Sequence, residues 1–202
     1  MKIARLAGFS LVVFAVLILL LAAQADKGLN IIQFPETRTV KVAFVSSGKI
    51  PAARVPAEVK FQEGKCRSAV KFANMKPAVL FGGEVTCYVR WAVNRDGAAE
   101  NLGELWVRPD AENDTVQFST GLRNFALLVT GEKYYQVPRP SEMVLFWNAN
   151  HPDPPVATDQ LIFRQFRPAP ASGVTSLEAV RYDGKKPLDL LQAEKVFQLA
   201  RE

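Results

Sequence analysis

The stretch TCYVRWAVNRDGAAENLGELWV, residues 86–107, decides the fold expected for this chain. Its first half alternates between two sets of side chains: Cys87, Val89, Trp91 and Val93, and Tyr88, Arg90 and Ala92. Successive side chains of a strand point to opposite faces, so this period of two predicts a strand whose Trp91 face turns inward. The Asp-Gly pair at 96–97 predicts a tight turn, because glycine adopts positive φ without a Cβ clash. A second strand is expected to follow, with Gly103 as a candidate bulge.

The chain around this hairpin repeats the same pattern. Short alternating stretches are separated by glycine, proline and acidic turns, at residues 39–46, 57–62, 68–75, 115–120, 122–130 and 141–147. About eight strands at roughly ten-residue spacing are typical of an antiparallel immunoglobulin-like β-sandwich, and a small barrel is the alternative. We therefore predict an all-β domain over 39–148, with residues 26–38 as an extended lead-in. Trp91 is expected to pack like the buried tryptophan of immunoglobulin sandwiches.

The N-terminus carries the features of an export signal. Lys2 and Arg5 precede a long apolar run, and the small-x-small sequence Ala-Gln-Ala occupies 23–25. This order predicts a secretory signal peptide over residues 1–25. The alternative is an uncleaved membrane anchor through residues 6–23, near the lower length limit for spanning a bilayer. Either assignment predicts an exported protein, periplasmic or membrane-anchored and facing the periplasm.

Composition excludes several classes of function. The 202 residues hold 25 Lys and Arg against 20 Asp and Glu, and the basic residues form no run. A nucleic-acid partner is therefore not expected, while a weak attraction to anionic envelope surfaces stays open. With two cysteines and one histidine, the chain is poor in zinc ligands, and we expect no metal and no cofactor.

The two cysteines, Cys66 and Cys87, leave two alternatives. An oxidising compartment would allow them to pair, and closing a loop of this size would stabilise the fold by about 3 kcal/mol in the chain-entropy model. In the other alternative both thiols are free. Cys87 would then pack inward beside Trp91, while Cys66 lies between Lys65 and Arg67 in the sequence.

The C-terminal region divides into a linker and a tail. Residues 149–173 are proline-rich and predict a stiff linker, with an edge strand or docking segment at 161–166. Residues 174–202 predict a helical tail in which Pro187 opens a helix. The apolar residues near one face of this helix are Leu188, Leu191, Val196 and Leu199. Because so short a helix is marginal alone, it should dock on the sandwich, dimerise or pair with another protein.

Two blocks of sequence resemble a known pattern. YVRWAVNRDGAAENLGEL at 88–105 and LVTGEKYYQVPRPSEMVLFWN at 128–148 are similar to motifs of a family of exported bacterial immunoglobulin-like β-sandwich domains of uncharacterised function. The resemblance covers roughly 72–202 and implies a structural or interaction role in the cell envelope, without catalytic residues. In relatives, helices follow such domains and sometimes lead into a peptidoglycan-binding domain like that of outer membrane protein A. The tail at 187–202 looks like the start of those helices.

No stretch carries a catalytic pattern. His151 lies in the linker sequence NANHPDPP, which is a poor scaffold for a triad. The acidic residues at 110–114 lack the glycine and the distal glutamate of a calcium loop. We therefore expect a non-enzymatic cell-envelope protein that presents its sandwich and C-terminal helix to an envelope protein or to itself. The alternative is a glycan- or peptide-binding module that uses the loop around Tyr134 and Tyr135.

Overall fold

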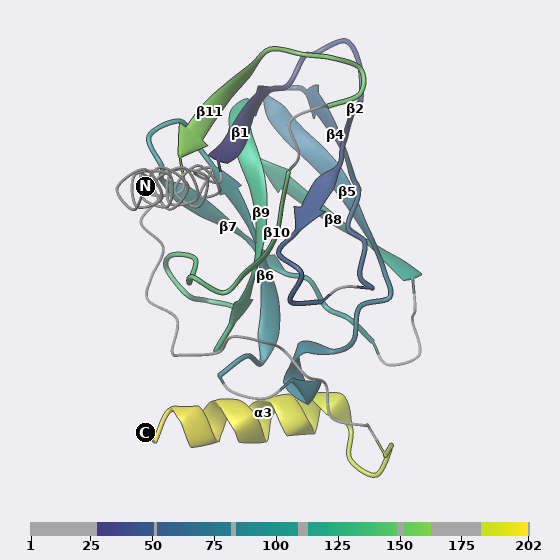
Figure 1. Ribbon diagram of the computed structural model, residues 1–202, viewed down its shortest axis with the longest axis vertical. Coiled ribbons are helices and arrows are strands. Elements are labelled where there is room, and N and C mark those ends of the chain that lie inside the picture. The colour runs from purple at the N-terminus through teal and green to yellow at the C-terminus, as the bar shows by residue number, and fades with distance from the viewer. Residues whose placement is uncertain are drawn as a thin grey trace, which may run out of the picture.

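The computed structural model describes residues 28–50, 52–81, 84–108, 113–148, 152–162 and 183–201. These residues form two antiparallel sheets, a short 3₁₀ turn η1 (Ala78–Leu80) and the helix α3 (Leu188–Leu199), as Figure 1 shows. The expectation of a mostly β chain with a C-terminal helix is confirmed. The predicted signal or anchor at 1–25 and His151 lie outside the described residues.

The strands divide unequally between the two sheets. The larger sheet has seven strands: β1 (Gly28–Gln33), β3 (Phe44–Ser46), β6 (Cys87–Val93), β7 (Ala99–Glu104), β9 (Asn124–Glu132), β10 (Val144–Asn148) and β11 (Thr158–Ile162). The smaller sheet has four: β2 (Val40–Val42), β4 (Ala57–Gln62), β5 (Lys65–Ala73) and β8 (Asn113–Thr120). The chain crosses between the sheets several times, and its last three strands, β9, β10 and β11, all lie in the larger sheet.

Strand β9 is the centre of the larger sheet. It pairs with β6 along one edge; along the other it pairs with β1 near its start and with β10 near its end. Strand β6 continues into β7 with a shift of register between Val89 and Trp91. Gly103 lies opposite this shift with a φ of 90°. The bulge expected at Gly103 is therefore confirmed. Glycine suits this position because residues that carry a side chain rarely adopt a positive φ.

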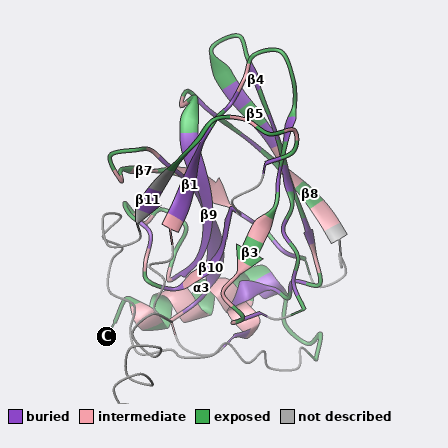
Figure 2. Ribbon diagram, turned by 45° about the horizontal axis from the view of Figure 1, so that its top comes forward, coloured by how far each residue is buried: buried purple, intermediate pink, exposed green. Residues whose placement is uncertain are grey.

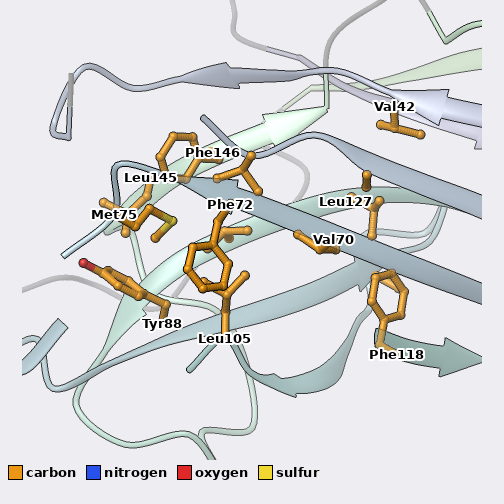
Figure 3. Packing of buried hydrophobic residues seen from close by; sticks show 14 of the residues in the cluster. Val42, Val70, Phe72, Met75, Tyr88, Leu105, Phe118, Leu127, Leu145 and Phe146 are labelled. Carbon is orange, nitrogen blue, oxygen red and sulfur yellow. The ribbon is translucent and has the colours of Figure 1, made fainter. Parts of the chain in front are cut away.

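The main core lies between the two sheets. Buried and exposed residues alternate along β4 and β5, which is the pattern of strands with one covered face. Figure 3 shows residues from both sheets in this core, among them Val70, Phe72 and Phe118 from the smaller sheet and Tyr88 and Leu127 from the larger. Burial of these apolar side chains is the main favourable contribution to folding.

The larger sheet is also buried on its other face. Every residue of β6 is buried, and Figure 2 shows β9 and β10 in the buried colour over most of their length. A second hydrophobic cluster on this outer face contains Cys87, Val89, Trp91 and Val93. Trp91 is fully buried, as expected, but it packs in this outer cluster and not between the two sheets like the tryptophan of immunoglobulin sandwiches. Tyr88 and Ala92 face the smaller sheet instead. The period of two identifies the two sets of side chains, but both sets are apolar enough for burial.

The domain extends beyond the predicted boundaries of 39 and 148. Strand β1 lies in the expected lead-in, and β11 lies in the expected linker, where an edge strand was one alternative. They pair from Gly28 opposite Ile162 to Ile32 opposite Thr158. Within the ranges that the structure describes, no helix combines the length and apolarity needed to cross a membrane.

Candidate functional site

Helix α3 docks on the chain's own domain. It begins after Pro187 and lies across one end of the domain beside η1 (Figure 1). Leu188 is buried, and the other residues of the predicted apolar face, Leu191, Val196 and Leu199, are partly buried. Of the three arrangements expected, docking on the domain is therefore the one observed. A partner of α3 would meet the side of the helix opposite Leu188.

Polar side chains anchor α3 to the domain. The Lys195 ammonium donates hydrogen bonds of 2.6 Å to the carbonyl oxygens of both Phe81 and Val85. The Gln192 amide donates to Glu104 Oε1 at 3.1 Å. Burial lowers the pKa of Lys195 and raises that of Glu104, although the bond from Gln192 opposes the second shift. Neither anchor was predicted from the sequence, although residues 192 and 195 share a helical face with Leu188.

The opposite side of α3 exposes two large apolar residues. Leu190 is 46% exposed and Phe197 is 65% exposed, and their spacing of seven places them on one face of the helix. The Arg201 guanidinium lies 5.8 Å from the centre of the Phe197 ring. We call Leu190 and Phe197 the outer face of α3. It presents apolar surface on an element that the Lys195 contacts hold in place.

The loop after β9 carries the two predicted binding tyrosines. Tyr134 and Tyr135 are 49% and 48% exposed. The Asn101 side chain donates to the carbonyl oxygens of Tyr135 at 2.7 Å and Val137 at 3.2 Å, so strand β7 holds the backbone of this loop. Thr86 Oγ1 donates to the Lys133 carbonyl at 2.5 Å on the other side. The two rings are therefore displayed on a fixed loop.

A buried carboxylate supports the base of this tyrosine loop. Glu132 accepts hydrogen bonds from the Thr130 hydroxyl and, at 2.9 Å, from the Ser141 backbone N–H. Thr130 Oγ1 in turn accepts a 2.8 Å bond from the Trp91 indole N–H. Burial raises the pKa of Glu132, while the bonds from Thr130 and Ser141 act against this shift. Each polar group here has a partner inside the fold, so the network connects the loop to the sheet.

The two cysteines are both free and buried. Cys66 lies in β5 and packs in the core between the sheets, whereas Cys87 lies in β6 and packs in the cluster on the outer face of the larger sheet. The disulfide alternative is therefore not the one observed. Burial raises the pKa of each thiol to about 12, so neither is poised as a nucleophile.

An arginine that sequence analysis placed in the strand pattern is buried between the sheets. The Arg90 guanidinium donates to the carbonyl oxygens of Leu102 and Glu104 in β7, each at 3.0 Å, and to Gln117 of β8 at 3.4 Å. It also lies 5.6 Å from the centre of the Phe118 ring. Burial lowers the pKa of Arg90 to about 10. Because its bonds join β7 to β8, Arg90 connects the two sheets and is not part of a surface site.

Neither a cluster of metal ligands nor a similarity to known proteins indicates a function. Among the described residues, no three His, Cys, Asp or Glu side chains gather as a metal site would require. No family model, curated protein or solved structure matches this chain. The candidate sites are therefore two surfaces that the fold exposes: the outer face of α3 and the tyrosine loop.

Proposed function

We propose that this chain is a non-enzymatic interaction protein of the cell envelope whose partner binds the outer face of α3. One observation carries the proposal: Phe197 and Leu190 are exposed on a helix whose opposite side is fixed by Lys195. An ordered helix with apolar side chains on one face fits the groove of a partner protein, and fixing it beforehand reduces the entropic cost of binding. The envelope location rests on the sequence of residues 1–25.

We also propose that the domain is immunoglobulin-like, and the strand order supports this. Strands β4, β5 and β8 form one sheet, while β7, β6, β9 and β10 adjoin in that order in the other. Taken in chain order, β4 to β10 correspond to strands A, B, C, C′, E, F and G of such domains. Strands A, B and E then form one sheet, and strands C′, C, F and G form the other. Domains of this architecture often act through exposed surfaces and loops.

Site-specific photocrosslinking tests the role of α3. A photoreactive residue in place of Phe197 of the full-length chain should yield one dominant adduct in cells, identified by mass spectrometry. A matched probe at Gln62, an exposed residue of β4, should not yield that adduct. Leu190→Asp should abolish the adduct, because a charge on the outer face opposes burial against a partner. An adduct of twice the chain mass would identify a second copy, whereas the same products from both probes would refute the proposal.

A second candidate function uses Tyr134 and Tyr135. Two exposed aromatic rings on a fixed loop suit a glycan or peptide ligand, because aromatic rings bury large apolar area at low entropic cost. Soluble peptidoglycan fragments titrated into the full-length chain should change its fluorescence. Tyr135→Ala should remove that change and Tyr135→Phe should retain it. A wild-type chain that does not respond, or a response unchanged by Tyr135→Ala, would rule this function out.

A further inference from the structure

The outer face of the four-stranded sheet gathers basic side chains that are dispersed in the sequence. Exposed residues alternate with buried ones along β4 and β5, so the exposed set points away from the core. The charged members of this set, with the neighbouring strand and turn, are five basic and two acidic residues: Lys41, Lys60, Lys65, Arg67, Lys71, Glu58 and Glu63. The sheet thus forms a basic surface, although the sequence contains no run of lysines that would predict it.

Two of these cations face each other directly. Lys60 of β4 is the register partner of Arg67 of β5. Like charges in directly opposed positions destabilise a sheet, by roughly 0.2–1 kcal/mol. The ion pair between Arg67 and Glu63, at 3.5 Å, offsets little of this, because the two side chains are 67% and 71% exposed. A bound anion would relieve this repulsion.

A shallow groove lies beside the pair. Its volume is about 570 Å³, and Lys60, Arg67, Gln117 and Ser119 are among its lining residues. Ala69, also in the lining, stands in register between Glu58 and Gln117, so the smallest side chain of the row leaves a hollow. The groove therefore crosses β4, β5 and β8, with cations beside amide and hydroxyl groups.

We propose that this groove binds a segment of an acidic polysaccharide. Carboxylate or sulfate groups would meet Lys60 and Arg67, and sugar hydroxyls would hydrogen-bond Gln117 and Ser119. Adjacent strands lie about 4.8 Å apart and alternate residues about 6.7 Å apart, so the cations can follow charges repeated along a chain. The acidic residue in the lining, Glu58, is opposed by Lys41 and lies 4.0 Å from the Lys71 ammonium, which reduces its repulsion of an anion.

Two other polyanions fit the groove less well. Single-stranded nucleic acid is usually held by aromatic side chains on which bases stack, and the one aromatic residue in the lining, Phe118, is 9% exposed and packs in the core between the sheets. An anionic bilayer is flat on the scale of this groove and would leave the hollow beside Ala69 unfilled. The combination of charge, hydroxyl groups and concave shape favours a glycan chain.

Affinity for polygalacturonate, measured on the full-length chain in nonionic detergent at several salt concentrations, tests the proposal. Lys60→Gln with Arg67→Gln should lower the affinity on the order of 10-fold. The slope of log affinity against log salt concentration should become shallower by about two, because about two fewer counterions are released on binding. The matched control, Arg139→Gln with Lys185→Gln, removes the same charge from exposed positions elsewhere and should change the affinity less than about twofold. Ala69→Leu fills the hollow without changing charge and should also weaken binding.

Four outcomes would overturn the proposal. They are no binding of polygalacturonate, an equal loss in the control variant, unchanged binding by Ala69→Leu, and preferential displacement by oligothymidine or by micelles containing phosphatidylglycerol. The circular dichroism spectrum of each variant shows whether it is folded. The double variant Lys60→Gln with Arg67→Gln is expected to fold because both positions are exposed. Failure here leaves the role of α3 untouched, because α3 contributes nothing to the groove.

Discussion

Lys195→Met should release α3 from the domain. The substitution keeps the length of the side chain but removes both bonds to the carbonyl oxygens of Phe81 and Val85. Hydrogen bonds from a charged donor contribute about 1.5–3 kcal/mol each when buried. Because Lys195 is partly exposed, we expect a total loss of about 1–3 kcal/mol. A helix of 12 residues is marginal without docking, so this loss should appear as local opening.

Amide hydrogen exchange measures that opening directly. Peptides from 188–199 should exchange about 5–150-fold faster in Lys195→Met, the range that corresponds to the expected loss of free energy. Peptides from β9 should keep their protection, because the core between the sheets is unchanged. Lys186→Met is the matched control: it removes a lysine and its 3.0 Å ion pair with Glu194 but leaves both bonds of Lys195 in place. Unchanged exchange of 188–199 in Lys195→Met would refute the anchoring role.

Three further predictions concern the interior and the basic surface. Without reductant, a thiol reagent should label neither Cys66 nor Cys87 in the folded chain and both after denaturation; no labelling after denaturation would reveal a disulfide. Burial raises the folded-state pKa of Glu132, so its contribution to stability should fall as pH rises through that pKa. Glu132→Gln should remove this fall. The prediction would be contradicted if the free energies of urea unfolding of the wild type and of Glu132→Gln ran parallel from pH 4 to 8. Lys60→Gln should stabilise the fold by about 0.2–1 kcal/mol by removing the repulsion of Arg67, and a lower urea midpoint would argue against that repulsion.

The local features of the central hairpin were predictable from sequence. Alternation in 87–93 predicted strand β6, and Gly103 marked the bulge. The same alternation could not say which set faces the second sheet. Trp91 and Tyr88 are both large and largely apolar, and the choice depends on what covers each face after folding. The larger sheet buries both, so apolar character alone did not separate them.

Pairing between distant segments was harder to predict. Strand β1 depends on β11, with Gly28 opposite Ile162, and no local pattern links positions so far apart in the chain. The sequence LNII within β1 lacks a regular alternation because its residues are buried on both sides. A buried amide links β1 to a further distant strand, since Asn148 Nδ2 at the end of β10 donates to the Asn30 carbonyl at 2.7 Å. Polar residues in such positions are read as surface residues in a sequence.

The same limitation hid the anchors of α3. Helical periodicity placed Leu188 on the inner face correctly, but Lys195 lies on that face as well. A lysine is expected in water, and only the two carbonyl oxygens at the end of η1 and before β6 make its burial favourable. Charge was misread in a different way on the smaller sheet. Lys60 and Arg67 are separated by a turn in sequence but adjoin across two strands.

The burial of the larger sheet bears on where ligands can bind. Two packed sheets have two outer faces, and here the outer face of the larger one is occupied by a hydrophobic cluster that includes Trp91, Leu128 and Trp147. The outer face of the smaller sheet is different, because Lys60 and Arg67 are exposed on it. Charged edges and faces protect a sheet from unwanted pairing. A cation paired with an anion would do so with a smaller loss of stability than two cations. Two like charges at this pair are therefore better explained by an anionic ligand than by solubility. If Lys60→Gln stabilises the fold and weakens the binding of polygalacturonate, the ligand is the explanation supported.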